Sequence, residues 1–179
     1  MGTDKALLPI GERTLVEHVA RQVEGAASTI TLIGPPAAYQ HLGLRIVEDV
    51  HRGSGPLSGI HAALLDTNAE WNLVVACDLP NVETVFLVQL LERAAEQGTD
   101  ALLPVGPSGF PEPLCAVYHR RCLPAIEKSM SEGVWKVTEA LRGLRLSEFA
   151  VQEGRWFENA NTPGEWQRIL QERGIATSR

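Results

Sequence analysis

Residues 72–80 read Asn-Leu-Val-Val-Ala-Cys-Asp-Leu-Pro, and this stretch decides the fold. Its first part, 72–77, is an unbroken apolar run without alternation, which is typical of a strand covered on both faces in a parallel sheet. It is the best candidate in the chain for a central strand. Asp78 follows the run directly, so we expect its carboxylate at the carboxyl edge of the sheet, where open α/β sheets bind ligands.

Strand-like and helical segments alternate on both sides of this stretch. Apolar runs predict strands at residues 28–33, 44–47, 100–105 and 113–118. Helical spacing and cap signals predict helices at residues 14–23, 57–65, 81–96, 122–130, 134–141 and 162–172. Asn81 is the expected cap of the helix 81–96, and Thr162 with Glu165 has the capping-box spacing. The alternation predicts an α/β fold with an open, mostly parallel Rossmann-like sheet and helices on both faces, formed by residues 1–179 as one domain.

Composition excludes several classes of protein. The 22 acidic and 16 basic residues give a net charge of -6 without a basic cluster, which argues against a nucleic-acid-binding surface. Three cysteines without C-x-x-C spacing indicate neither a disulfide framework nor a zinc site, and a reducing cytoplasm is expected. No run approaches the ~20 apolar residues of a membrane span. A polyphosphate site on such an acidic chain is expected to need a divalent cation and a lysine.

Polar residues that follow the predicted strands are the candidate site residues. Asp78 suits a hard cation, although it could be a plain loop aspartate. Asp49 closes the strand 44–47 and could accept hydrogen bonds from a base or ribose, or serve as a turn residue. The glycines of the following loop, 51–59, permit close backbone approach to a ligand, but they match neither the Rossmann nor the Walker pattern.

Two further places carry weaker signals. Asn159 and Asn161 flank Ala160 and point the same way if the segment is extended, which makes them available to a ligand or metal as well as to a turn. Spacing alone gives Lys5 no role beyond that of a solvated lysine near the N-terminus. No G-x-S-x-G elbow or paired histidine spacing is present, so no motif for nucleophilic hydrolysis is found.

Five short motifs occur together in one order. They are Met-Gly-Thr-Asp-Lys-Ala-Leu-Leu at 1–8, Val-Glu-Asp at 47–49, Gly-Pro-Leu-Ser-Gly at 55–59, Cys-Asp-Leu-Pro at 77–80 and Asn-Ala-Asn-Thr-Pro at 159–163. In this combination the chain resembles the molybdenum cofactor guanylyltransferases, a group of MobA-like nucleotidyltransferases. The resemblance covers nearly the whole chain, and residues 112–118 and 133–136 look like this branch of the nucleotidyltransferases.

The resemblance implies a reaction. GTP and the molybdenum-molybdopterin cofactor would give the guanine dinucleotide cofactor and pyrophosphate, with Mg²⁺ required. Lys5 and Asp78 would be the catalytic residues, Lys5 neutralising the phosphates and Asp78 holding the metal. Attack on an α-phosphorus needs positioning and charge neutralisation more than a covalent residue, so the missing nucleophile motif agrees with this reading.

The resemblance also implies binding residues and partners. The nucleotide would contact Lys5, Asp49, Asp78, Gly55, Pro56 and Leu57, and Asp49 would face the guanosine moiety. Asn159 and Asn161 would serve the pterin cofactor or the metal. The partners implied are GTP, the molybdopterin cofactor, and molybdoenzymes or their chaperones.

One family feature has no counterpart in this sequence. In the family a first strand leads into a Leu-Ala-Gly-Gly loop that ends Arg-Met-Gly, and Met1-Gly2 resembles the end of that loop. A sheet without that strand is expected to leave neighbouring strand edges exposed, and we expect weak GTP binding or poor folding. Two alternatives stay open: a cytidylyl- or sugar-phosphate nucleotidyltransferase on the same fold, and a non-catalytic cofactor-binding relative.

Overall fold

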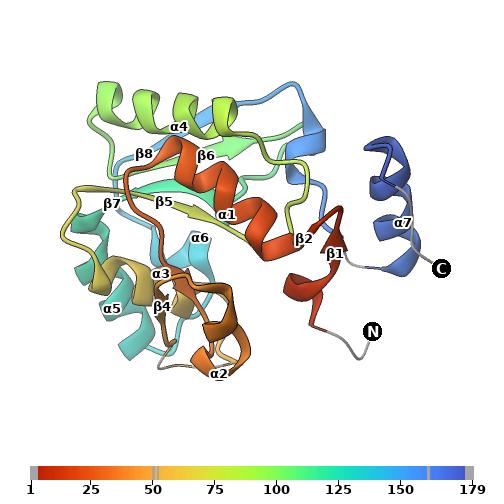
Figure 1. The fold of residues 1–179 in the computed structure, drawn as a ribbon. Coiled ribbons are helices and arrows are strands. Elements are labelled where there is room, and N and C mark those ends of the chain that lie inside the picture. Colours follow the sequence, from red (N-terminus) through yellow and green to blue (C-terminus); the bar gives the residue numbers. More distant parts are fainter. Residues whose placement is uncertain (1–3, 50, 52, 161, 176–179) are drawn as a thin grey trace.

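The computed structural model describes residues 4–49, 51, 53–160 and 162–175 (Figure 1). The strands are β1 (Pro9–Ile10), β2 (Arg13–Thr14), β3 (Leu32–Ile33), β4 (Ile46–Val47), β5 (Trp71–Val75), β6 (Ala101–Val105), β7 (Cys115–His119) and β8 (Leu146–Ala150). The α-helices are α1 (Leu15–Ala26), α2 (Pro36–Tyr39), α3 (Pro56–Asp66), α4 (Thr84–Gln97), α5 (Leu123–Ser131), α6 (Val137–Ala140) and α7 (Pro163–Glu172). Short 3-10 helices cover Lys5–Leu7, Gln40–Leu42, Arg120–Cys122 and Gly154–Phe157. Within the described residues, none of the helices is both long and apolar enough to cross a membrane.

The α/β class is confirmed, and the main sheet is mixed. Its strand order is β5-β7-β6-β8, with β6 and β8 parallel and β7 antiparallel to both of its neighbours. The direction of β7 follows from the short connection 106–114, which contains no helix, because parallel neighbours need a crossover of about a dozen residues or more. Strands β3 and β4 form a separate parallel pair, and β1 and β2 form a small antiparallel hairpin.

Strand β5 does not lie where its sequence predicts. It is an edge strand of the main sheet, and all five of its residues are partly exposed, whereas β6 and β7 are buried over four of their five residues. The segment 28–33 also pairs over a shorter length than predicted, because only β3 joins β4. Strand β8 was not predicted, because its buried and exposed positions alternate and its apolar residues form no continuous run.

Local capping residues determine where α1 and α7 begin, whereas a contact with a distant residue determines where α4 begins. Reciprocal side-chain and backbone hydrogen bonds form capping boxes at the starts of α1 and α7, the second of which was predicted from Thr162. The prediction that Asn81 caps a helix is wrong. Helix α4 begins at Thr84, whose N–H donates to the side chain of Gln22 at 2.9 Å, and the Asn81 amide instead donates to Glu158 at 3.3 Å.

Two hydrophobic clusters cover the two faces of the sheet. Helices α1, α4 and α7 contribute to one, which includes Phe86, and helices α3, α5 and α6 contribute to the other, which includes Tyr118. Figure 1 shows α1 and α4 on one side of the strands and α3 and α5 on the other. This layered arrangement fixes the carboxyl ends of the strands and the loops that follow them.

A buried carboxylate ties the end of α4 to β8 and makes stability depend on pH. Asp100 is 7% exposed and accepts the Arg145 N–H at 2.7 Å, and it forms ion pairs with the guanidinium groups of Arg145 and Arg121. Burial alone would raise its pKa, but these hydrogen bonds and charges outweigh burial and lower the pKa to about 2 from 3.8.

Because the folded-state pKa of Asp100 is lowered, its contribution to stability is present above pH ~4 and is lost as the pH falls toward ~2. We expect the free energy of unfolding to decrease across this interval, and to decrease less in Asp100→Asn. Urea unfolding at a series of pH values measures both slopes. Glu96→Gln, an exposed carboxylate on α4, is the control and should keep the wild-type slope. Equal slopes in Asp100→Asn and the wild type would contradict the assignment.

Candidate active site

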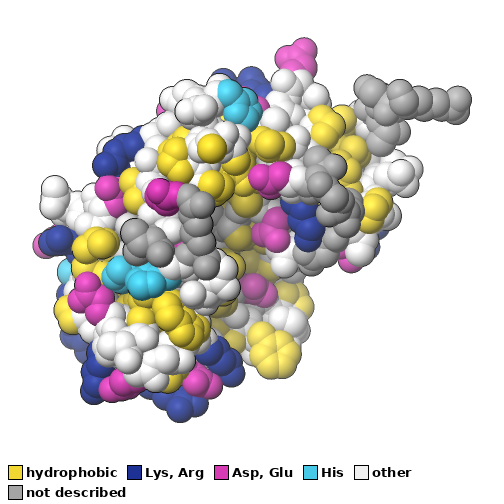
Figure 2. Space-filling model, turned by 90° about the horizontal axis from the view of Figure 1, so that it is seen from below, with side chains coloured by type: hydrophobic (Ala, Val, Ile, Leu, Met, Phe, Trp, Pro, Cys, Tyr) yellow, Lys and Arg dark blue, Asp and Glu magenta, His cyan; other side chains and the backbone are white. Residues whose placement is uncertain are grey.

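A cavity of about 450 Å³ brings together three of the predicted site residues. Lys5 enters it from the N-terminal 3-10 turn, Asp78 from the segment after β5, and Pro56 from the start of α3. Figure 2 shows the face of the molecule below the view of Figure 1, which is hollowed near its centre and carries acidic side chains around the hollow. A lysine, a carboxylate and a helix start thus share one cavity at the end of β5.

Asp78 is half-buried and lies beside the other polar segment that was singled out. Its backbone carbonyl accepts the N–H of Ala160 at 3.3 Å, and Ala160 is fully buried, which anchors the segment. Asn159 precedes Ala160 in the chain and is exposed to solvent, and it is not among the residues that line the cavity. Asn161 lies outside the described residues.

The loop before α3 is built around Asp49. Its carboxylate accepts the N–H of His51 at 2.8 Å and the hydroxyl of Ser58 at 2.6 Å, which ties the end of β4 to the first turn of α3. Gly55 precedes the helix with φ +89°, a conformation that residues with a side chain rarely adopt. Pro56 then occupies the first helical position, where a missing N–H costs nothing.

Two features of this loop matter for a phosphate ligand. The N–H groups in the first turn of a helix have no partner within the helix and favour an anion. Leu57, however, is fully buried in the hydrophobic cluster on this face. Its side chain therefore cannot contact a nucleotide in this structure, and any contact from this residue would come from its backbone.

The turn that carries Lys5 is stabilised by Asp4 and Tyr39, which the sequence did not indicate as site residues. Asp4 accepts the N–H of Ala6 at 3.0 Å and the hydroxyl of Tyr39 at 2.6 Å, so one carboxylate connects the N-terminal turn with α2. Burial and the hydrogen bond to Asp4 raise the pKa of Tyr39. Asp4 directly before an apolar turn is a capping signal, whereas its contact with Tyr39 spans 35 residues and leaves no local trace.

Cys77 lies in the same cavity and is not suited to act as a nucleophile. Burial raises its pKa to about 11, and the carboxylates of Asp78 and Asp4 act in the same direction. The thiol is therefore neutral near pH 7, whereas a nucleophilic cysteine reacts as the thiolate. This agrees with the absence of a nucleophile motif in the sequence.

The donor set fits a magnesium ion that is held mainly by its substrate. Among the residues described, no group of three or more histidine, cysteine, aspartate or glutamate side chains could hold a metal ion. Mg²⁺ usually takes one or two protein carboxylates and completes its shell with phosphate oxygens and water. Asp78 can supply such a carboxylate, and a closed all-protein metal centre is not required.

Residues 1–146 match the family described as the MobA-like NTP transferase domain. The chain belongs to the MobA-like NTP transferase family. Membership gives it the nucleotidyltransferase class of enzyme, in agreement with a cavity that combines a lysine, a carboxylate and a helix start. The match includes the parts of the chain that carry Lys5, Asp49, Pro56 and Asp78.

Named relatives and solved structures support this membership. The probable molybdenum cofactor guanylyltransferase of Pelotomaculum thermopropionicum is 35% identical over 92% of this chain and 83% of its own length. That of Bacillus mycoides is 29% identical over 92% and 86%. The molybdopterin-guanine dinucleotide biosynthesis protein A of Archaeoglobus fulgidus superposes with a TM-score of 0.78 at 26% identity, covering 97% of this chain and 92% of its own.

More distant structures share the fold of this MobA-like chain. The 2-C-methyl-D-erythritol 4-phosphate cytidylyltransferase of Thermus thermophilus superposes with a TM-score of 0.76 at 18% identity, covering 96% of this chain and 94% of its own. At this identity the likeness concerns the Rossmann-like nucleotidyltransferase fold alone.

Proposed function

We propose that this protein transfers GMP from GTP to the molybdenum-molybdopterin cofactor, which forms the guanine dinucleotide cofactor and releases pyrophosphate. The observation that carries the proposal is the shared cavity of Lys5, Asp78 and the start of α3 in a chain of the MobA-like family. The names of its relatives at 28–35% identity support guanylyl transfer in particular.

The chemistry requires charge neutralisation more than covalent catalysis. An oxygen of the acceptor's terminal phosphate attacks the α-phosphorus of GTP, a new P–O bond forms, and the bond to the β-phosphate oxygen breaks to release pyrophosphate. Lys5 would neutralise phosphate charge, and the first backbone N–H groups of α3 would bind phosphate oxygens. Asp78 would hold Mg²⁺, which when bound supplies further neutralisation of the same phosphates.

Base and acceptor recognition would fall to Asp49 and Asn159, which do not line the cavity themselves but belong to segments bonded to α3 and to Asp78. Asp49 uses both carboxylate oxygens within its loop, yet each oxygen has a second lone pair that can accept from the N–H groups of guanine. Asn159 is exposed in the segment bonded to Asp78, where its amide can bind the pterin part of the acceptor or a metal-bound water.

The deciding experiment measures magnesium-dependent transfer from GTP and from CTP to molybdopterin cofactor by the full chain. GTP-selective formation of the dinucleotide cofactor, with release of pyrophosphate, is the expected result. Selectivity for CTP would replace the proposal with cytidylyl transfer. Binding of the pterin cofactor by a folded sample without turnover would favour a non-catalytic relative.

Lys5→Ala is expected to lower transfer by about tenfold or more, because one charged group that stabilises the phosphates is lost. The change should be measured as kcat/KM for GTP. Lys128→Ala removes an exposed lysine of α5 that pairs with Glu132, just after the helix. This variant should leave kcat/KM unchanged. If kcat/KM fell equally in both variants, or in neither, Lys5 would not be part of the phosphate site.

A further inference from the structure

The hairpin after β6 presents an exposed aromatic ring at the edge of the sheet where the candidate site lies. Strands β5 and β6 are both antiparallel to β7, so they run in the same direction and their carboxyl ends share one edge. Asp78 follows β5 at this edge, and residues 106–111 follow β6. Phe110 in this hairpin is 73% exposed. Its ring and the Asp78 carboxylate therefore lie at the same edge of the sheet.

The backbone of the hairpin is held in one conformation. The N–H of Gly109 donates to the carbonyl of Gly106 at 2.9 Å, and Gly109 has φ +76°, which is the pattern of a tight turn followed by a left-handed residue. Just beyond the turn, Pro111 pairs with Val105 in an antiparallel bridge. Phe110 lies between the turn and the bridge, so a ligand that binds its ring does not have to order a loose loop.

The side chains of Phe110 and Glu112 point to the same face of the hairpin. They are two residues apart in an extended segment, in which alternate side chains share a face. The pairing of the hairpin sets Gly106 opposite Phe110, and a Cβ on Gly106 would lie 2.9 Å from the ring of Phe157. This face is therefore the one on which Phe157 packs, and the chain continues from there to Asn159, the proposed acceptor residue.

Glu112 carries a carboxylate that is half-buried without a partner. Its backbone N–H donates to Pro104 at 2.9 Å, whereas its side chain has no hydrogen bond or ion pair within the described residues. Burial raises the pKa of Glu112, and no neighbouring cation offsets this effect. A carboxylate in such a position is favoured only when something supplies hydrogen-bond donors to it.

The hairpin is joined directly to the cavity that contains Asp78. Leu114, two residues after Glu112, lines this cavity, and its carbonyl accepts the N–H of Ala76 at 2.6 Å. Phe110 is four residues from Leu114, so the two lie within about 14 Å of one another. A ligand with its phosphate at Asp78 can therefore reach Phe110 with the rest of its length.

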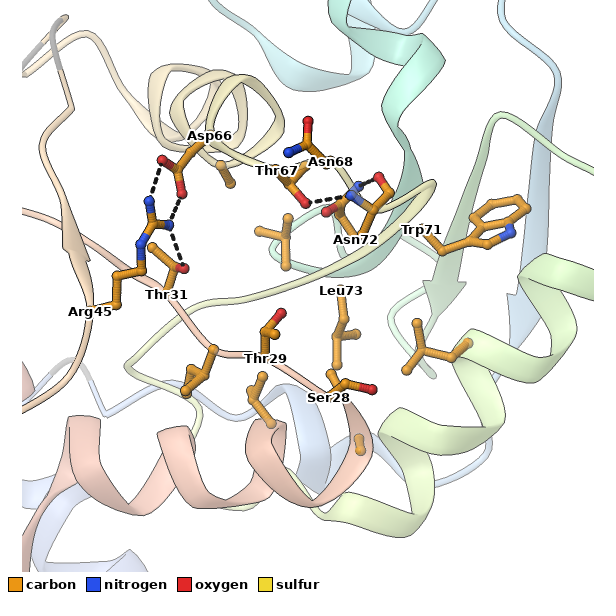
Figure 3. Close-up of a pocket in the computed structure, with 18 residues that line it drawn as sticks. Ser28, Thr29, Thr31, Arg45, Asp66, Thr67, Asn68, Trp71, Asn72 and Leu73 are labelled. Atoms are coloured by element: carbon orange, nitrogen blue, oxygen red, sulfur yellow. Dashed lines mark hydrogen bonds and ion pairs between the residues drawn. The ribbon is translucent and has the colours of Figure 1, made fainter.

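The larger cavity of the molecule does not suit the same ligand. It has a volume of about 850 Å³, and Figure 3 shows its lining, in which Trp71 marks the amino end of β5 and Asp66 is joined to Arg45. Asp78 follows the opposite end of β5 and does not line this cavity. An acceptor that brings its phosphate to Asp78 is thus expected to place its ring on the side of the hairpin.

We infer that Phe110 and Glu112 bind the pterin ring of the acceptor, Phe110 by stacking on its face and Glu112 by accepting hydrogen bonds from its edge. The inference rests on the proposed function, which supplies a pterin-bearing acceptor. A pterin is flat, and its exocyclic amino group and the adjacent ring N–H are two neighbouring donors that match the two oxygens of a carboxylate. Guanine has the same edge, but its proposed partner is Asp49 in the loop before α3.

The first test measures binding of hydroxymethylpterin to the full chain without GTP, followed by the quenching of pterin fluorescence. Phe110→Ala is expected to raise Kd about tenfold, because the stacking partner of a flat heterocycle is lost. Phe110→Trp keeps an aromatic face and should bind like the wild type. Leu65→Ala, at a position on α3 that is 55% exposed, is the control and should also keep the wild-type Kd. An unchanged Kd in Phe110→Ala, or no binding by the folded wild type, would overturn the inference.

The second test assigns the edge of the pterin to Glu112. Lumazine carries a carbonyl where pterin carries the exocyclic amino group, so it offers the carboxylate one donor fewer. We expect the wild type to bind hydroxymethylpterin about tenfold more tightly than lumazine, and Glu112→Gln to lose this preference. Glu96→Gln, an exposed carboxylate on α4, should retain the preference. The same preference in Glu112→Gln and the wild type would contradict the role of Glu112.

These titrations can fail independently of the proposed function. If pterin binding depended on Phe110 in a chain without transfer activity, the inference would hold and the proposed function would fall. If the chain transferred GMP while pterin binding ignored both substitutions, the reverse would follow. In an active chain, Phe110→Ala should raise KM for the acceptor about tenfold and leave KM for GTP unchanged. A rise in KM for GTP alone would assign the hairpin to guanine and overturn the inference.

Discussion

Asp78→Asn is expected to lower magnesium-dependent nucleotidyl transfer by about a hundredfold or more while leaving the fold intact. Asp78 is the carboxylate that enters the shared cavity from the end of β5, and an amide keeps its size but loses the charge that a hard cation requires. Its side chain is half-buried at the sheet edge and outside both hydrophobic clusters, so stability should change little. Transfer from GTP at saturating magnesium and urea unfolding measure the two effects.

Asp66→Asn is the matched control for this substitution. Asp66 lies at the end of α3 and pairs with Arg45 at the surface, and neither residue lines the cavity that contains Asp78. Loss of an exposed ion pair costs at most about 1 kcal/mol and should leave transfer unchanged. If a folded Asp78→Asn protein turned over like the wild type, or if Asp66→Asn lost as much activity, Asp78 would not be the metal ligand.

The order of elements could be predicted because it depends on local patterns. Apolar runs and cap residues gave the α/β class, the capping box at Thr162 and the glycine-rich start of α3. The pairing of β5 could not be predicted, because a continuous apolar run reports that both faces are covered and does not report which edges find a partner. In this structure the helices cover the faces, while β5 pairs with β7 along one edge and has no strand partner along its other edge among the described residues.

The proximity of candidate residues could be predicted where they follow strands, and local sequence did not predict the contacts that span the chain. Asp78 follows β5, and Pro56 follows the loop after β4. The structure places both residues in one cavity with Lys5. Asn81 was misassigned, because its helix starts later and is held by a residue 62 positions away. Leu57 was assigned to the nucleotide-binding loop because of its position in the motif at 55–59. Its side chain instead lies on the buried face of α3, in the core.

Phe86→Ala is expected to lower the free energy of unfolding by about 3–5 kcal/mol, the range for removal of a buried phenylalanine. Phe86 on α4 is fully buried, stacks on Trp156 with a centroid distance of 4.1 Å, and meets Phe157 edge to face at 5.7 Å. Urea denaturation measures the change. Phe110→Ala, at a residue 73% exposed, is the control and should stay within about 0.5 kcal/mol of the wild type.

The same substitution also tests the proposed role of Asn159 in binding the acceptor. Trp156 and Phe157 belong to the 3-10 helix that leads to Asn159, and Phe157 packs so closely on Gly106 that a Cβ there would lie 2.9 Å from its ring. Without Phe86 this helix loses its main support, so the position of Asn159 loosens. In conditions where Phe86→Ala remains folded, we expect KM for the pterin acceptor to rise while KM for GTP changes little. An unchanged KM for the acceptor, or a loss of stability below about 1 kcal/mol, would show that the aromatic stack does not hold this segment in place.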